Sequence, residues 1–233
     1  PFRFVSWEPE VKTVLRRNPE WWGIAAGRFE GNVDRIVYRP IKSDSTRMAA
    51  LVSGEIDFVL DPPLQDIARV NASPNLKVMT GPELRTIFLG MDQKRDELLF
   101  SSVKGKNPFK DKRVRQAFYQ AIDINGIQRV VMRGASKPTA LMVGPGINGF
   151  DASMNNRLPY DAEAAKKLLA DAGYPTGFEV AMNCPNDRYV NDGEICQAVA
   201  ANLARVGVKI NLQAETKVSY FPKILSRNTS FYL

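Results

Sequence analysis

Arg188 is the residue best suited to hold a ligand, because it lies in a polar loop between an apolar run and a helical pattern. A guanidinium presents a fixed fork of donors, which fits a carboxylate or a phosphate through two parallel hydrogen bonds. Asn183, Asn186 and Tyr189 lie beside it in the sequence and add further polar groups. We therefore predict a ligand-binding loop around Arg188.

The same residues also fit a purely structural interpretation. Arg188 could pair with Asp187 or Asp192 and stiffen the loop, and the residue types alone weigh the two interpretations about evenly. Arg85 is a second candidate for ligand binding. It stands at the start of an apolar run, where an arginine is more often an ordinary surface residue.

Catalytic chemistry has little support in this sequence, which contains no histidine. That absence removes Ser-His-Asp and Cys-His catalysis and most zinc and copper sites. Paired carboxylates stay open, although capping or solvated positions already explain Asp34, Asp57 and Asp123. Residues 144–149 match the dinucleotide pattern GxGxxG, but Pro145 removes an amide and no helix follows. We expect no catalytic residue, metal site or cofactor.

The Arg188 loop belongs to a predicted strand–loop–helix–strand unit. Residues 178–183 and 208–212 are short apolar-rich runs typical of strands, and apolar residues recur at helical spacing between them. Asn191 and Glu194 predict a capping pair at the start of the helix. Gly207 predicts a residue with left-handed backbone conformation at its end. A right-handed crossover makes the strands parallel and places the loop at the carboxyl end of the first, where ligands of open α/β sheets usually bind.

Two cysteines, Cys184 and Cys196, flank this loop. Their spacing matches neither a zinc site nor a Cys-x-x-Cys redox pair. In the cytosol they would be two small buried hydrophobic residues. In an oxidising compartment a disulfide between them would join the loop to the first turns of its helix and restrict Arg188. We favour the disulfide if the protein is exported.

The totals describe an ordinary globular chain. Apolar residues make up 44% and charged residues 24% of its 233 positions, and no apolar run approaches the ~20 residues that a membrane span needs. The net charge of +7 is spread along the chain, which is typical of a solvated surface.

One group of basic and aromatic residues could be taken for a nucleic-acid patch, but four residues are thin support. They are Arg16, Arg17, Trp21 and Trp22. We expect aromatic packing there and no nucleic-acid partner.

Both ends of the chain lie inside apparent strands, at residues 2–7 and 231–233, so we expect a piece of a longer protein. Gly81-Pro82 marks a break between two α/β parts, over residues 1–82 and 83–233.

We expect a long loop over residues 134–160. Further strands are predicted over residues 33–39, 55–60, 76–80 and 84–91, and helices over 45–53, after Asp61-Pro62, after Asp111, over 127–132, after Asp161 and over 220–226.

Six segments in order resemble the family 5 extracellular solute-binding proteins of ABC importers, which bind dipeptides, oligopeptides, nickel or glutathione. They lie at residues 4–23, 45–57, 84–90, 109–117, 160–175 and 204–209, and include LRRNPEWWG, LVSGEID and FKDKRVRQA. The resemblance implies an α/β, type II periplasmic-binding-protein-like fold. Residues 1–82 would be part of lobe I, and residues 83–233 most of lobe II, C-terminally truncated.

The resemblance also implies a function, namely the substrate-binding component of an ABC importer. Such a protein captures a peptide or similar small solute between two lobes and delivers it to a membrane permease. The expected location is periplasmic, the expected state is a monomer, and no enzymatic activity is expected. In similar dipeptide binders an arginine of the corresponding loop grips the ligand carboxylate, and Arg188 falls in that loop. The alternative is an α/β enzyme domain that uses paired carboxylates.

Overall fold

A computed structural model describes residues 1–28, 32–81 and 83–233 in two compact units, Pro1–Lys77 and Val78–Leu233. We call them unit 1 and unit 2 and describe each by itself. The boundary lies five residues before the break predicted after Pro82, which is outside the described residues. The assignment of the units to lobe I and lobe II stays a prediction.

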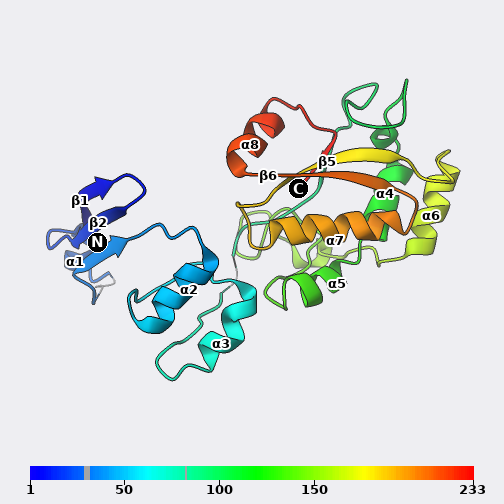
Figure 1. Cartoon of the computed structure of the whole chain (residues 1–233). Helices are drawn as coiled ribbons and strands as arrows, with labels where there is room; N and C mark the ends of the chain where they lie inside the picture. The colour runs from blue at the N-terminus through cyan, green and yellow to red at the C-terminus, as the bar shows by residue number, and fades with distance from the viewer. Residues whose placement is uncertain (29–31, 82) are drawn as a thin grey trace. The chain divides into compact units, whose positions relative to one another are not determined.

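Unit 1 contains a three-stranded antiparallel sheet in the order β1-β2-β3 (Figure 1). The predicted strand at residues 2–7 is confirmed by β1, which pairs with β2, and β3 confirms the strand predicted at 33–39 over its central residues. The three strands are β1 (Phe2–Glu8), β2 (Lys12–Arg17) and β3 (Arg35–Tyr38).

The longest helix of unit 1, α2, follows local capping signals. Helix α2 begins where the Ser43 hydroxyl accepts a hydrogen bond from the backbone N–H of Thr46, and it ends at Gly54, whose φ is 77°. This confirms the predicted helix at 45–53. The helices and turns are α1 (Trp22–Ala25), α2 (Asp44–Ser53), η1 (Leu64–Asp66) and α3 (Ile67–Asn71).

Three predictions for residues 55–80 are wrong. The segments predicted as strands at 55–60 and 76–80 form no strand, because neither pairs with a neighbouring backbone. The helix expected directly after Asp61-Pro62 starts only at Leu64. A proline disfavours the helical conformation in the residue before it, and Pro63 imposes this restriction on Pro62.

Unit 2 contains a four-stranded sheet in the order β4-β7-β5-β6, and β5 runs parallel to both β6 and β7. This confirms the predicted parallel strand–helix–strand unit. The strand predicted at 84–91 is reduced to two residues, because β7 offers it only a two-residue partner. The strands are β4 (Gly90–Met91), β5 (Glu179–Pro185), β6 (Lys209–Glu215) and β7 (Phe231–Tyr232).

Two of the longer helices of unit 2, α4 and α6, begin at capping carboxylates. Asp111 and Asp161 accept hydrogen bonds from the backbone N–H groups of Arg113 and Ala164, as predicted. The elements are η2 (Pro108–Lys110), α4 (Lys112–Ala121), α5 (Ile124–Gly126), the π-helical turn η3 (Ile127–Val131), η4 (Ala152–Met154), α6 (Ala162–Asp171), α7 (Asp192–Ala204) and α8 (Lys217–Leu225). Residues 134–160 are irregular except for η4, a single 3-10 turn, and no α-helix opens directly after residues 144–149.

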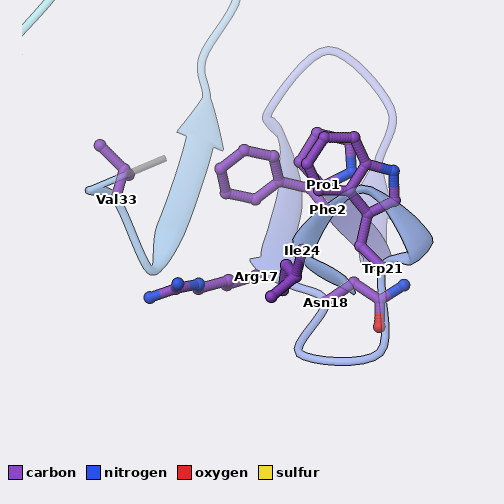
Figure 2. A pocket seen from close by; sticks show the side chains of 7 residues that line it. All are labelled: Pro1, Phe2, Arg17, Asn18, Trp21, Ile24 and Val33. Atoms are coloured by element: carbon purple, nitrogen blue, oxygen red, sulfur yellow. The ribbon is translucent and has the colours of Figure 1, made fainter. Parts of the chain in front are cut away.

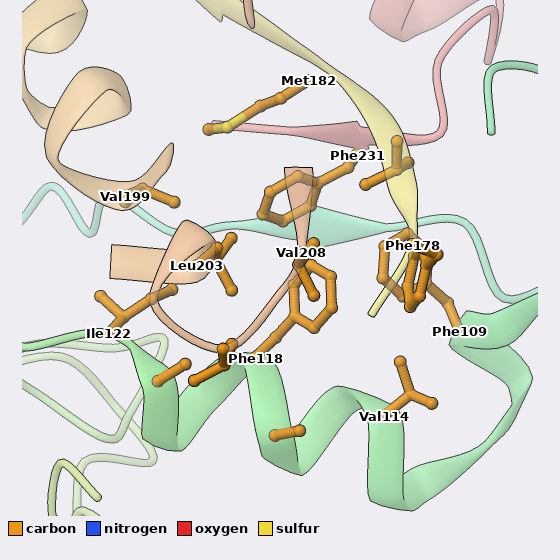
Figure 3. Close-up of a cluster of buried hydrophobic side chains, with 14 of the residues drawn as sticks. Phe109, Val114, Phe118, Ile122, Phe178, Met182, Val199, Leu203, Val208 and Phe231 are labelled. Atoms are coloured by element: carbon orange, nitrogen blue, oxygen red, sulfur yellow. The ribbon is translucent and has the colours of Figure 1, made fainter. Parts of the chain in front are cut away.

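A continuous apolar core joins the sheet of unit 2 to its helices (Figure 3). Phe118 projects from α4, and its ring centroid lies 5.2 Å from that of Phe109 and 5.6 Å from that of Phe231 on β7. All three phenylalanines are fully buried. Because the core covers β5 and β7, the carboxyl ends of these strands sit on a closely packed base. Within the described residues, no helix is long and apolar enough to cross a membrane.

Candidate functional site

The carboxyl ends of β5, β6 and β7 meet at one edge of the unit-2 sheet, since the three strands are parallel. Residues 186–191, which we call the edge loop, connect β5 to α7 at this edge. The backbone N–H of Asn186 donates to the carbonyl of Glu215 at 2.9 Å, so the loop starts as a continuation of the β5–β6 pairing. This is the position at which open α/β sheets usually bind ligands.

Asp192, the first residue of α7, anchors the backbone of the edge loop. Its side chain is buried, with 4% exposure. One carboxylate oxygen accepts hydrogen bonds from the backbone N–H groups of Arg188 and Tyr189, and the other accepts one from Gly193, each at 2.9 Å. A carboxylate also complements the positive N-terminal end of α7. The backbone that carries Arg188 is therefore held in one conformation.

The predicted Asn191–Glu194 capping pair is wrong. Asn191 makes no side-chain capping hydrogen bond and has a left-handed backbone with a φ of 53°. Its amide nitrogen donates instead to the carbonyl of Val131 at 2.8 Å. Asp192 supplies the carboxylate to the first turn because Asn191 is engaged by another segment. At the other end, Gly207 has a φ of 85°, the left-handed conformation predicted for it.

Arg188 is exposed and lies over the ring of Tyr189, with 4.9 Å between its guanidinium carbon and the ring centroid. The two acids that could have paired with it are engaged elsewhere. Asp192 binds backbone amides, and the Asp187 carboxylate accepts from the backbone N–H of Lys217 at 2.6 Å. In the part of the chain that the structure describes, no ion pair engages the Arg188 guanidinium. The loop-stiffening ion pair considered above is therefore absent from these residues.

Arg85 reaches the same tyrosine from a distant segment. Its guanidinium carbon lies 5.8 Å from the Tyr189 ring centroid, and it pairs with Glu83 at 2.8 Å. The structure thus brings two of the predicted residues, Arg85 and Arg188, to the aromatic ring of a third, Tyr189. Asn186 lies exposed at the start of the same loop.

Asn183 does not belong to this group, and we withdraw it as a ligand contact. Its side chain is 2% exposed and already hydrogen bonded on both sides. The amide nitrogen donates to Gln213 and Glu215, each at 3.1 Å, and the amide oxygen accepts from Thr229 at 2.8 Å. These hydrogen bonds join β5 to β6 and to the segment before β7, and this is the role of Asn183 in the structure.

The structure contains a disulfide between Cys184 and Cys196, both fully buried. It joins the end of β5 to the second turn of α7, on either side of the edge loop. The loop is therefore held at both of its ends by a covalent link as well as by Asp192. This is the arrangement that the sequence favours for an exported protein.

Sequence reasoning missed the aromatic and charged residues that other elements bring to this edge. Burial raises the pKa of Tyr220, and the neighbouring Tyr189 and Tyr232 raise it further. The Tyr220 hydroxyl donates to the backbone carbonyl of Leu233. Lys223 on α8 pairs with Glu215 at the end of β6. No sequence spacing links α8 or β7 to the edge loop, so only the fold could have revealed these neighbours.

Two surface hollows lie away from the edge loop. The one in unit 1 has a volume of about 10 Å³, room for about one water molecule, and Trp21 and Arg17 line it together with Phe2 (Figure 2). Trp21 thus packs on the strands, whereas Trp22 stays 67% exposed. The one in unit 2, about 560 Å³, is lined by Lys106 and Tyr174 among others and contains none of the predicted site residues.

Comparison with known proteins identifies the family. The model of bacterial extracellular solute-binding proteins, family 5, middle region, matches residues 1–233. The chain belongs to this family. Members of this family are solute-binding proteins, which supports the prediction of a binding module and leaves the alternative of an enzyme domain without support. The family is extracellular by its description, which agrees with the expectation of an exported protein.

Individual relatives agree with this family. The chain is 28% identical to heme-binding protein A of Haemophilus influenzae over 219 residues, which cover 91% of the chain and 36% of that protein. It is also 28% identical to the glutathione-binding protein GsiB of Pectobacterium atrosepticum over 217 residues, which cover 92% of the chain and 38% of that protein. The chain spans less than half the length of these curated relatives.

A solved structure confirms the predicted α/β fold of periplasmic binding proteins. The protein DppA of Helicobacter pylori, in complex with the peptide STSA, superimposes with a TM-score of 0.80. The match has 24% sequence identity and covers all of this chain and 41% of that chain. It supports the fold and does not by itself identify the solute.

Proposed function

We propose that the full-length protein is the substrate-binding component of an ABC importer. It captures a peptide or similar small solute between two lobes and delivers it to a membrane permease, as a monomer in the periplasm. Unit 1 belongs to lobe I and unit 2 to lobe II, with the hinge near Gly81. The observation that carries the proposal is the unpaired Arg188 guanidinium at the carboxyl edge of the parallel strands, among the described residues.

Arg188 holds a carboxylate of the solute in this proposal. Its fork of N–H donors fits both oxygens of a carboxylate, and the Tyr189 ring limits the orientations that the guanidinium can take. Asp192 fixes the backbone of both residues, so less conformational freedom is lost when the solute binds. Closure of the second lobe then excludes water, which strengthens the attraction between the guanidinium and the carboxylate.

The test begins with native mass spectrometry of the gently purified full-length protein, which should carry a small molecule. Calorimetry then compares the wild type with Arg188→Ala. Loss of a charged hydrogen-bond pair costs about 1.5–3 kcal/mol, so we expect roughly 10- to 150-fold weaker binding. Lys166→Ala, which removes an exposed cation on α6, is the control and should bind normally.

A solute that binds equally well to Arg188→Ala would contradict the role of Arg188. A full-length protein that stays empty after exposure to peptide and metabolite mixtures would contradict the proposed function as a whole. The 233-residue chain alone should bind weakly at best, because it spans less than half of its relatives.

A further inference from the structure

Two arginines from distant parts of the sequence place their guanidinium groups against one aromatic ring. The guanidinium carbon of Arg188 lies 4.9 Å from the centroid of the Tyr189 ring, and that of Arg85 lies 5.8 Å from it. The two cations are therefore no further apart than the sum of these distances. A ring face attracts a cation at this range, but the two guanidinium charges repel each other.

Among the described residues, neither guanidinium is held in a strong ion pair. Arg85 pairs with Glu83, and the two side chains are 39% and 63% exposed. Exposed ion pairs of this kind are weak, so another anion can replace Glu83 at small cost. Arg188 has no ion-pair partner among residues 1–28, 32–81 and 83–233. Within the described part of the chain, the exposed Arg85–Glu83 contact is thus the only ion pair that either guanidinium makes.

The other acids near the edge loop are engaged in structural contacts. Asp192 accepts three backbone hydrogen bonds, and Asp187 accepts one from the N-terminal end of α8. Glu215 pairs with Lys223 and also accepts a hydrogen bond from Asn183. These carboxylates keep their charge, but none of them forms an ion pair with either guanidinium among the described residues. The N–H donors of Arg188, and those of Arg85 once Glu83 is displaced, can therefore bind two carboxylates from outside the chain.

We propose that the solute carries two carboxylates, one held by Arg188 and the other by Arg85, with the segment between them lying on Tyr189. The proposal rests on the proposed function and narrows the solute class to small dicarboxylates, for example a peptide with an acidic side chain. Each guanidinium fork fits one carboxylate. A solute with a single carboxylate on Arg188 would leave Arg85 with only its exposed ion pair to Glu83.

Matched acid and amide probes test the proposal by calorimetry on the full-length protein. The pairs are Ala-Glu with Ala-Gln, Ala-Asp with Ala-Asn, and glutarate with its monoamide. We expect the acid of at least one pair to bind at least about tenfold tighter than its amide. In Arg85→Gln this preference disappears while the amide affinity stays the same. Arg188→Gln weakens both members of the pair.

Two further variants separate ligand binding from a structural role of Arg85. Lys166→Gln is the matched control, since it removes a 49% exposed cation from a 2.9 Å ion pair on α6, and it should leave the acid preference unchanged. Glu83→Gln releases Arg85 from its counter-ion and should tighten binding of the acid about two- to fivefold. A purely structural Arg85 would not produce that gain.

Equal affinity for the acid and amide members, with both weakened in Arg188→Gln, would overturn the two-carboxylate proposal and leave the proposed function standing. A folded full-length protein that binds none of the six probes would also overturn the two-carboxylate proposal, whereas only a protein that stays empty after exposure to peptide and metabolite mixtures would overturn the proposed function.

Discussion

The two units differ in how completely they bury their own apolar residues. In unit 2, Phe118 and Phe231 are fully buried between α4 and the sheet. In unit 1, Phe4 and Trp7 on β1 are 65% and 64% exposed. Exposed aromatic groups on a small sheet add little to its stability, since burial provides most of the driving force. Unit 2 therefore supplies the rigid base on which the edge loop is held.

Substitution of one phenylalanine in each unit gives the largest expected difference. Phe118→Ala should lower the free energy of unfolding of the 233-residue chain by about 3–5 kcal/mol, because it leaves a cavity among three other rings. Phe4→Ala should change it by less than about 0.5 kcal/mol. Urea denaturation followed by circular dichroism measures both. An equal cost for the two variants would break the comparison.

The elements of unit 2 were predictable where their signals are local. Asp111 and Asp161 precede their helices in the sequence and cap them in the structure. The apolar runs of β5 and β6, separated by a helical pattern, were sufficient to predict the parallel pair and the place of the edge loop. The strands predicted at 55–60 and 76–80 failed because a strand exists only beside a partner, which composition does not reveal.

The candidate site was only partly predictable for the same reason. Arg188 and Tyr189 were found because they share one loop. The approach of Arg85 to Tyr189 is a tertiary contact between distant segments, and the capping role passed from Asn191 to Asp192 because Asn191 bonds to Val131. Asn183 was misassigned because a polar residue at the end of a strand can face the sheet network as easily as the ligand.

The edge loop offers a test of intermediate size. Asp192→Ala leaves three backbone N–H groups without their acceptor, and we expect it to lower the free energy of unfolding by about 1–3 kcal/mol. Asn191→Gly is the matched variant, because glycine accepts the φ of 53° and only the bond to Val131 is lost. Its expected cost is about 1 kcal/mol or less. A larger cost for Asn191→Gly, again by urea denaturation, would restore Asn191 as the main cap.

The smallest expected effect is a difference in acid sensitivity between the units. Burial alone would raise the pKa of Asp92 in unit 2, but hydrogen bonds from Arg95 and Lys94 outweigh it and hold the pKa below the ordinary 3.8. A lowered native pKa means that the contribution to stability is complete above pH 3.8 and is lost as the pH falls through the native value. Asp92→Asn should therefore reduce the loss of stability below that pH.

Glu10 in unit 1 is the matched control for Asp92. A hydrogen bond from Lys42 lowers its pKa too, but the Glu10 side chain is 74% exposed. Solvent and salt screen such a pair, so Glu10→Gln should leave the acid unfolding curve unchanged. Thermal unfolding of both variants between pH 2 and pH 6 measures the difference. If Glu10→Gln protected against acid as well as Asp92→Asn does, burial in unit 2 would not be what makes its carboxylates matter for stability.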